Sequence, residues 1–259
     1  MEEIKGLLID LDGVIYNDSL LIDGAVESIR WLQEMQTPFR FITNTTMKSR
    51  ETLQKKLKSF GISVEKEQIF SAVYAAVSYI KKSGKQKCHL LLKEDAQKEF
   101  SAFDLEAEKP DFVVVGDLGE SLNFESMNIA FQKLFSGAEL LALQKNRYWL
   151  SDRGYTMDAG ALVAMLEFSA KKKAQVIGKP SPHFFALALD DLGLSPENVV
   201  MIGDDVESDI KGAQRMGVRG VLVKTGKYLP ANLERKDVKP WRVIDSIVEL
   251  KSIFKQDDV

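Results

Sequence analysis

Short runs of apolar residues alternate along the chain with longer segments in which apolar residues recur every three or four positions. The short runs predict strands at 4–9, 39–42, 88–92, 112–116, 139–143, 174–178, 198–203 and 219–223. The longer segments predict helices at 24–36, 47–60, 122–136, 159–170, 182–192, 206–216 and 245–254. Strands that alternate with helices are typical of an α/β protein built on a parallel sheet.

Polar side chains follow four of the predicted strands. They are, in chain order, Asp10 and Asp12, Thr43 and Asn44, Lys179, and Asp204 and Asp205. In an open parallel sheet, ligands bind outside the carboxyl ends of the strands. We therefore expect these groups to face one cavity.

The first pair of carboxylates indicates a cation site. Successive side chains of an extended strand point to opposite faces, so Asp10 and Asp12 are expected on one side and Leu11 on the other. Two ionised carboxylates held together repel each other unless a cation lies between them. Asp204 would supply a third carboxylate, and Mg²⁺ prefers a few carboxylates together with waters and phosphate oxygens. The sequence therefore predicts a magnesium site.

The same residues suit phosphoryl transfer. Asp10 is expected to attack phosphorus and form an aspartyl-phosphate, while Asp12 protonates the leaving oxygen and later takes a proton from water. Thr43 and Asn44 are expected to donate hydrogen bonds to the phosphoryl oxygens. Lys179 would add a fixed positive charge.

Four segments resemble, in order, the four motifs of the haloacid dehalogenase-like hydrolases. They are "DLDGV" at 10–14, "TN" at 43–44, "GKP" at 178–180 and "GDDVESD" at 203–209. The resemblance implies a Mg²⁺-dependent phosphatase in which Asp10 is both nucleophile and metal ligand. It also implies that Asp12 is the general acid and base and binds the metal through its backbone carbonyl, and that Asp204 is the third ligand. Thr43, Asn44 and Lys179 would then contact phosphate, with Asp209 as a supporting acid.

The long interval between the second and third motifs resembles the subclass that carries a large α/β cap there. This resemblance implies a doubly wound, Rossmann-like core formed by residues 1–73 and 172–259, with residues 74–171 as the inserted cap. It also suggests a homodimer formed through the cap. Because the core motifs account only for phosphate and metal, we expect the cap to close over substrate, with contacts from its loop at 153–158. Further segments, including "GKPSPHFF" and "VKTGKY", are similar to the group that contains phospholysine phosphohistidine inorganic pyrophosphate phosphatase. The segment "LALQKNRYWLSDRG" departs from the Asn-Pro-Asp form of many caps in this subclass.

The composition of the chain excludes some classes of binding partner and indicates a cellular location. The chain has 259 residues and a net charge of −3, which gives no basic footprint for nucleic acid. Its single cysteine, Cys88, cannot form an internal disulfide, which fits a reducing compartment. We find no apolar run of ~18 residues and no signal-peptide pattern in "MEEIK". We therefore expect a cytoplasmic enzyme that acts on a small phosphorylated molecule and binds neither nucleic acid nor membrane.

Other interpretations of the same residues stay open at this stage. Asn44, Thr45 or Thr46 could cap the helix predicted at 47–60, and Asp205 could cap the helix at 206–216. Asp209 could face solvent or hold the loop. The strand-end carboxylates could also serve a non-catalytic phosphoacceptor module, or an enzyme that hydrolyses carbon–halogen bonds. Asp12 favours the phosphatase, because neither alternative needs a second acid to protonate a leaving group.

Overall fold

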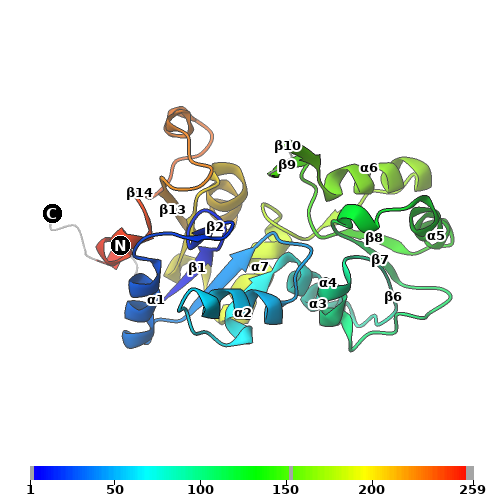
Figure 1. Cartoon of the computed structure of the whole chain (residues 1–259), viewed down its shortest axis with the longest axis horizontal. Coiled ribbons are helices and arrows are strands. Elements are labelled where there is room, and N and C mark those ends of the chain that lie inside the picture. Colours follow the sequence, from blue (N-terminus) through cyan, green and yellow to red (C-terminus); the bar gives the residue numbers. More distant parts are fainter. Residues whose placement is uncertain (1–2, 152–153, 255–259) are drawn as a thin grey trace. The chain divides into compact units, whose positions relative to one another are not determined.

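A computed structural model describes residues 3–151 and 154–254 of the chain. It divides into two compact units. The first contains the residues up to Thr43, the segment Leu53–Phe70 and the residues from Lys179 onward; the second contains Asn44–Thr52 and Ser71–Gly178. In Figure 1, the second unit carries most of the green part of the chain.

The first unit is built on a six-stranded sheet whose central strand is β1 (Gly6–Asp10). Across the sheet, the order is β14 (Arg242–Ile244), β13 (Arg219–Val223), β12 (Val199–Gly203), β1, β4 (Phe39–Thr43) and β5 (Ile69–Ser71). β1 runs parallel to β12 and β4, with Ile9 opposite Ile202 and Asp10 opposite Ile42. The carboxyl ends of these three strands are therefore neighbours.

Helices cover both faces of this sheet. They are α1 (Ala25–Glu34), α2 (Arg50–Ser59), α7 (Pro182–Leu192), the π-helix η5 (Val206–Lys211), α8 (Gly212–Gln214) and the 3₁₀ helix η7 (Ile247–Phe254). Shorter elements are β2 (Tyr16–Asn17), β3 (Leu20–Leu21), and the 3₁₀ turns η1 (Lys66–Gln68), η4 (Pro196–Asn198) and η6 (Pro230–Glu234). All five residues of β1 are buried, as expected for a strand covered on both faces. The predicted doubly wound α/β class is confirmed.

The bounds of α7 follow the signals in its sequence. The Ser181 side chain accepts the backbone N–H of His183 at 3.3 Å, and Pro182 is the first helical residue. The helix ends at Gly193, whose φ of 73° is in the left-handed region that glycine tolerates. The sequence predicted this helix with the same bounds.

The second unit has a four-stranded sheet of its own, in which every described strand pair is parallel. Its order is β11 (Gln175–Val176), β8 (Glu139–Ala142), β7 (Phe112–Val115) and β6 (Cys88–Leu91). The helices of this unit are α3 (Ala72–Ser83), α4 (Glu94–Gln97), η2 (Lys98–Phe100), η3 (Gly119–Ser121), α5 (Phe124–Phe135) and α6 (Ala159–Ala170). The hairpin β9 (Tyr148–Ser151) and β10 (Gly154–Met157) completes it. The class of an α/β core with an additional α/β unit is thereby confirmed, while the cap bounds 74–171 stay a prediction.

Several elements differ from the sequence-based expectation. The strand expected at 174–178, before Lys179, is β11, and it pairs with β8 of the second sheet instead of joining the first. A short apolar run can join either sheet, so its sequence does not choose between them. The pattern also missed β5 and α3. Among the described residues, no helix is both long and apolar enough to span a membrane.

The helix expected at 206–216 begins as the π-helix η5. The Asp205 carbonyl accepts the N–H of Asp209 at 2.9 Å and that of Ile210 at 3.3 Å, and the second bond spans one residue more than in an α-helix. Periodicity cannot reveal this widening. It matters because Asp209 lies within the widened turn and is fully buried.

Candidate active site

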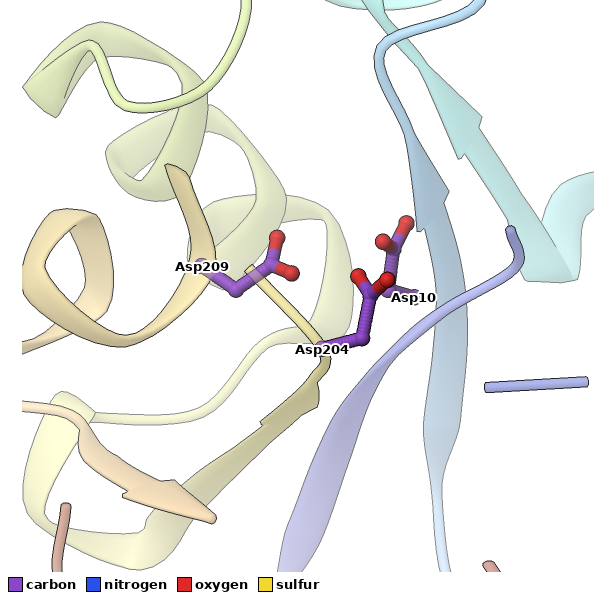
Figure 2. A group of neighbouring side chains, drawn as sticks. All are labelled: Asp10, Asp204 and Asp209. Atoms are coloured by element: carbon purple, nitrogen blue, oxygen red, sulfur yellow. The ribbon is translucent and has the colours of Figure 1, made fainter. Parts of the chain in front are cut away.

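Three aspartates meet where β1 and β12 end. Asp10 is the last residue of β1, Asp204 follows Gly203 at the end of β12, and Asp209 lies in η5. One carboxylate oxygen from each lies within 4.8 Å of the others, and all three residues are buried. Figure 2 shows their carboxyl groups turned toward one another.

Lys179 links two of these carboxylates. Its Nζ lies 2.8 Å from Asp10 Oδ1 and 2.7 Å from Asp209 Oδ1, and the lysine is only 4 % exposed. Asp209 Oδ2 accepts the backbone N–H of Asp205 at 3.2 Å. Asp209 therefore holds Lys179 and the turn that follows Asp204. The alternative that Asp209 faces solvent is wrong.

Asp204 has one satisfied oxygen and one unpaired oxygen. Its Oδ2 accepts the backbone N–H of Lys227 at 2.7 Å. Its Oδ1 is buried and has no hydrogen-bond partner in the described part of the chain. Because buried polar atoms are nearly always satisfied, an orphaned carboxylate oxygen indicates a missing partner. Together with an oxygen of Asp10, it offers carboxylate ligands that fit a hard divalent cation, whereas both oxygens of Asp209 already accept from Lys179 and from the Asp205 N–H.

Burial and mutual repulsion keep these carboxyl groups easily protonated. Burial, with a contribution from the charge of Asp204, raises the pKa of Asp10 to about 6, although Lys179 opposes the shift. Burial and the charge of Asp209 raise the pKa of Asp204 to about 6. Burial and the charge of Asp10 raise the pKa of Asp209 to about 7. Burial alone would lower the pKa of Lys179, but Asp10 and Asp209 outweigh it and the pKa is raised.

Asp12 lies two residues beyond the end of β1. Its side chain is exposed, and its carboxylate is not part of the buried group of three. The strand geometry ends at Asp10, because the Leu11 carbonyl accepts the N–H of Ile15 at 2.9 Å and turns the chain. The charge of Asp12 contributes to the raised pKa of Asp10, so the two carboxylates lie within electrostatic range of each other. The surrounding protein still removes part of its hydration and raises its pKa, with Lys56 opposing the shift.

Thr43 and Asn44 lie at the carboxyl end of β4, as expected. Thr43 is the last residue of β4 and is buried, next to the end of β1. The Asn44 side chain lies against Gly178, where a Cβ would come within 2.7 Å of Asn44 Oδ1. Thr43 belongs to the first compact unit and Asn44 to the second.

The two interpretations in which a polar residue caps the next helix have opposite outcomes. Helix α2 begins at Arg50, and the Ser49 side chain accepts the N–H of Thr52 at 3.3 Å. Capping by Asn44, Thr45 or Thr46 is therefore wrong. Asp205 does cap η5, since its Oδ1 accepts the N–H groups of Glu207 and Ser208 at 3.0 Å each.

Comparison with known proteins places the chain in a family. A family model described as haloacid dehalogenase-like hydrolase matches residues 7–106, and one described as HAD-hydrolase-like matches residues 176–250. Phospholysine phosphohistidine inorganic pyrophosphate phosphatase from Homo sapiens is 34% identical over 98% of this chain and 95% of its own length. This chain belongs to the haloacid dehalogenase-like hydrolases. The predicted resemblance is confirmed.

Other relatives of this hydrolase support the same family assignment. Haloacid dehalogenase-like hydrolase domain-containing protein 2 from Mus musculus is 36% identical over 94% of this chain and 93% of its own length. Among solved structures, a p-nitrophenyl phosphatase from Archaeoglobus fulgidus superposes with a TM-score of 0.90 at 28% identity, over 97% of this chain and 100% of that chain. The whole described hydrolase therefore shares its fold with proteins named phosphatases.

Proposed function

We propose that this hydrolase is a Mg²⁺-dependent phosphatase that acts on small phosphate esters or related phospho-compounds through an aspartyl-phosphate. One observation carries the proposal. The buried Asp10 is paired with Lys179 at 2.8 Å, beside an Asp204 whose Oδ1 has no hydrogen-bond partner among the described residues. A buried carboxylate suits attack on a phosphoryl group when a fixed positive charge lies beside it and a second carboxylate nearby can bind a metal ion.

Each residue has a role in this reaction. An oxygen of Asp10 attacks phosphorus, and the bond between phosphorus and the leaving oxygen breaks. Asp12 gives its proton to that oxygen, and its raised pKa and exposure suit exchange with solvent. Water then attacks the phosphorus of the aspartyl-phosphate, Asp12 takes a proton from this water, and Asp10 is restored. Thr43 and Asn44 would donate hydrogen bonds to phosphoryl oxygens.

Asp10, Asp204 and the Asp12 backbone carbonyl would hold Mg²⁺, as the family resemblance implies. The bound ion would neutralise charge on the phosphoryl oxygens. Lys179 opposes the rise in the pKa of Asp10 and adds its own positive charge to that effect. Asp209 acts through Lys179, which it holds at 2.7 Å.

The proposal also covers the inserted segment and the location of the protein in the cell. Residues 74–171 would form the cap that selects the leaving group and through which a homodimer would form. The closing loop was expected at 153–158, of which Arg153 lies outside the described residues. The single cysteine supports a cytoplasmic location.

Phosphate release from p-nitrophenyl phosphate tests the reaction. We expect turnover with MgCl₂, and a loss of about 100-fold or more after dialysis against EDTA that added Mg²⁺ reverses. A phosphoacceptor module would show no turnover under either condition. A dehalogenase would instead release chloride from a haloacid without added metal. Either of these results would contradict the proposal.

Protons and Mg²⁺ are expected to compete for the carboxylates. The pKa values of Asp10 and Asp204 rise from 3.8 to about 6, so between these values the folded protein binds more protons than the unfolded chain. Without metal, their contribution to stability therefore falls as pH rises through about 6. Since Mg²⁺ binds the ionised forms, MgCl₂ should raise the thermal unfolding midpoint more near pH ~7.5 than near pH ~5. Equal shifts at both pH values, compared with NaCl at matched ionic strength, would show that these carboxylates do not bind the ion.

A further inference from the structure

The loop after β13 lies against the candidate active site. It contains Thr225, Gly226 and Lys227, within the segment "VKTGKY". The Thr225 hydroxyl donates a hydrogen bond to the backbone carbonyl of Gly13, which directly follows Asp12. The backbone N–H of Lys227 donates to Asp204 Oδ2 at 2.7 Å. One short loop therefore contacts both acidic segments of the site, which are about 190 residues apart in the sequence.

Two glycines let this loop approach closely. Gly226 has a φ of 61°, and a Cβ there would lie 2.1 Å from Asp204 Oδ2 and 2.6 Å from the Gly13 Cα. Gly13 has a φ of 87°, and its Cβ would lie 2.0 Å from the same oxygen. Both the space and the backbone conformation therefore exclude a side chain at either position. Asp204 Oδ2 is enclosed by backbone, so the carboxylate cannot exchange its two oxygens without disturbing the loop.

The two carboxylate oxygens of Asp204 differ because the loop encloses only one of them. Its Oδ2 accepts a hydrogen bond from the loop, while its buried Oδ1 has no partner within residues 3–151 and 154–254. Partners that hold a metal ligand in one orientation typically change metal affinity by about 10- to 100-fold. The loop thus determines which oxygen is available to a cation, and Thr225 ties it to the turn that carries Asp12.

We propose that Thr225 is a positioning residue for the Mg²⁺ site, acting through the loop 225–227 on Asp204 and on the turn at Asp12 and Gly13. Its hydroxyl fixes the distance between these two segments, so its loss weakens Mg²⁺ binding. This inference rests on the Mg²⁺ dependence in the proposed function. Thr225 touches neither the substrate nor the reacting atoms in this proposal.

Direct calorimetric titration of the full-length protein with MgCl₂ tests this role. We expect Thr225→Val, which keeps the side-chain shape and loses the hydroxyl, to raise the Mg²⁺ dissociation constant by about 10-fold. Thr225→Ser keeps the hydroxyl and should stay within about twofold of the unmodified protein. Thr37→Val is the matched control, since Thr37 is half-buried and precedes the amino end of β4, away from the strand ends that carry the site. Thr225→Ala serves if the valine variant does not fold.

A purely structural role would give a different result. Thr225→Val would then lower the thermal unfolding midpoint without metal and leave the Mg²⁺ dissociation constant unchanged, and this outcome would overturn the inference. Failure of the serine variant to preserve binding would overturn it too. If the unmodified protein takes up no Mg²⁺, the metal dependence in the proposed function fails as well. The two failures are distinguishable because the unmodified protein is titrated first.

Discussion

Asp10→Asn is expected to lower the rate of phosphate release from p-nitrophenyl phosphate by about 10⁴-fold or more. The amide keeps nearly the same shape but lacks the anionic oxygen that attacks phosphorus, so no aspartyl-phosphate can form. Fold and binding should survive, because the amide oxygen can still accept from Lys179, which lies 2.8 Å from Asp10 Oδ1. Initial rates at saturating substrate and Mg²⁺ measure the effect.

The aspartyl-phosphate intermediate provides a second measurement for the Asp10→Asn prediction. Acid-quenched unmodified protein should carry phosphate on the peptide that contains Asp10, and the asparagine variant should not, as seen by mass spectrometry. Asp23→Asn is a control, because Asp23 is an exposed carboxylate in the same unit. A rate for Asp10→Asn within tenfold of the unmodified protein would show that another group is the nucleophile.

The parts of the site that lie at strand ends could be predicted from sequence. The run at 4–9 leads directly into Asp10, and the run at 198–203 leads into Asp204. Because parallel strands bring their carboxyl ends to one edge, short-range pattern is enough to bring these two carboxylates together. The bounds of α7 were equally accessible, since a serine cap, a proline and a terminal glycine are local signals.

The parts that depend on long-range contacts could not be predicted. Lys179 was expected after a strand of the first sheet, but β11 belongs to the second, and only the chain's return at Gly178 brings the lysine to Asp10. The exposure of Asp12 was not predicted, because the turn made by the Leu11 carbonyl has no clear sequence signature. Asp209 is buried by a π-type turn that periodicity cannot detect.

The contacts of the loop 225–227 could not be predicted from the sequence either. Its segment was noticed only for its similarity to a group of relatives, and nothing local links it to Gly13, which lies 212 residues away. Glycines at 13 and 226 were the available signal, because both need left-handed backbone conformations. A sequence shows that such glycines exist, but only the structure shows that both of them enclose Asp204.

Lys179→Met is expected to destabilise the protein by about 3–5 kcal/mol near neutral pH, because it leaves the buried carboxylates of Asp10 and Asp209 without their cation. Urea unfolding of the metal-free protein measures the free energy of unfolding. Lys224→Met is the matched control, since Lys224 forms an exposed ion pair with Asp245 at 2.7 Å that solvent screens, and we expect little change there.

The loss should depend on pH in a direction that follows from the charges. In the unmodified protein, Lys179 opposes the rise in the pKa values of Asp10 and Asp209, which still reach about 6 and about 7. Without the ammonium group, both pKa values rise further above the unfolded-state value of 3.8, so the folded variant keeps protons that the unfolded chain releases. The difference in free energy of unfolding between the two proteins should therefore be small near pH ~4 and grow as pH rises toward about 8. A difference independent of pH would instead assign the effect to lost packing of the lysine side chain, and would mean that its charge does not balance the buried carboxylates.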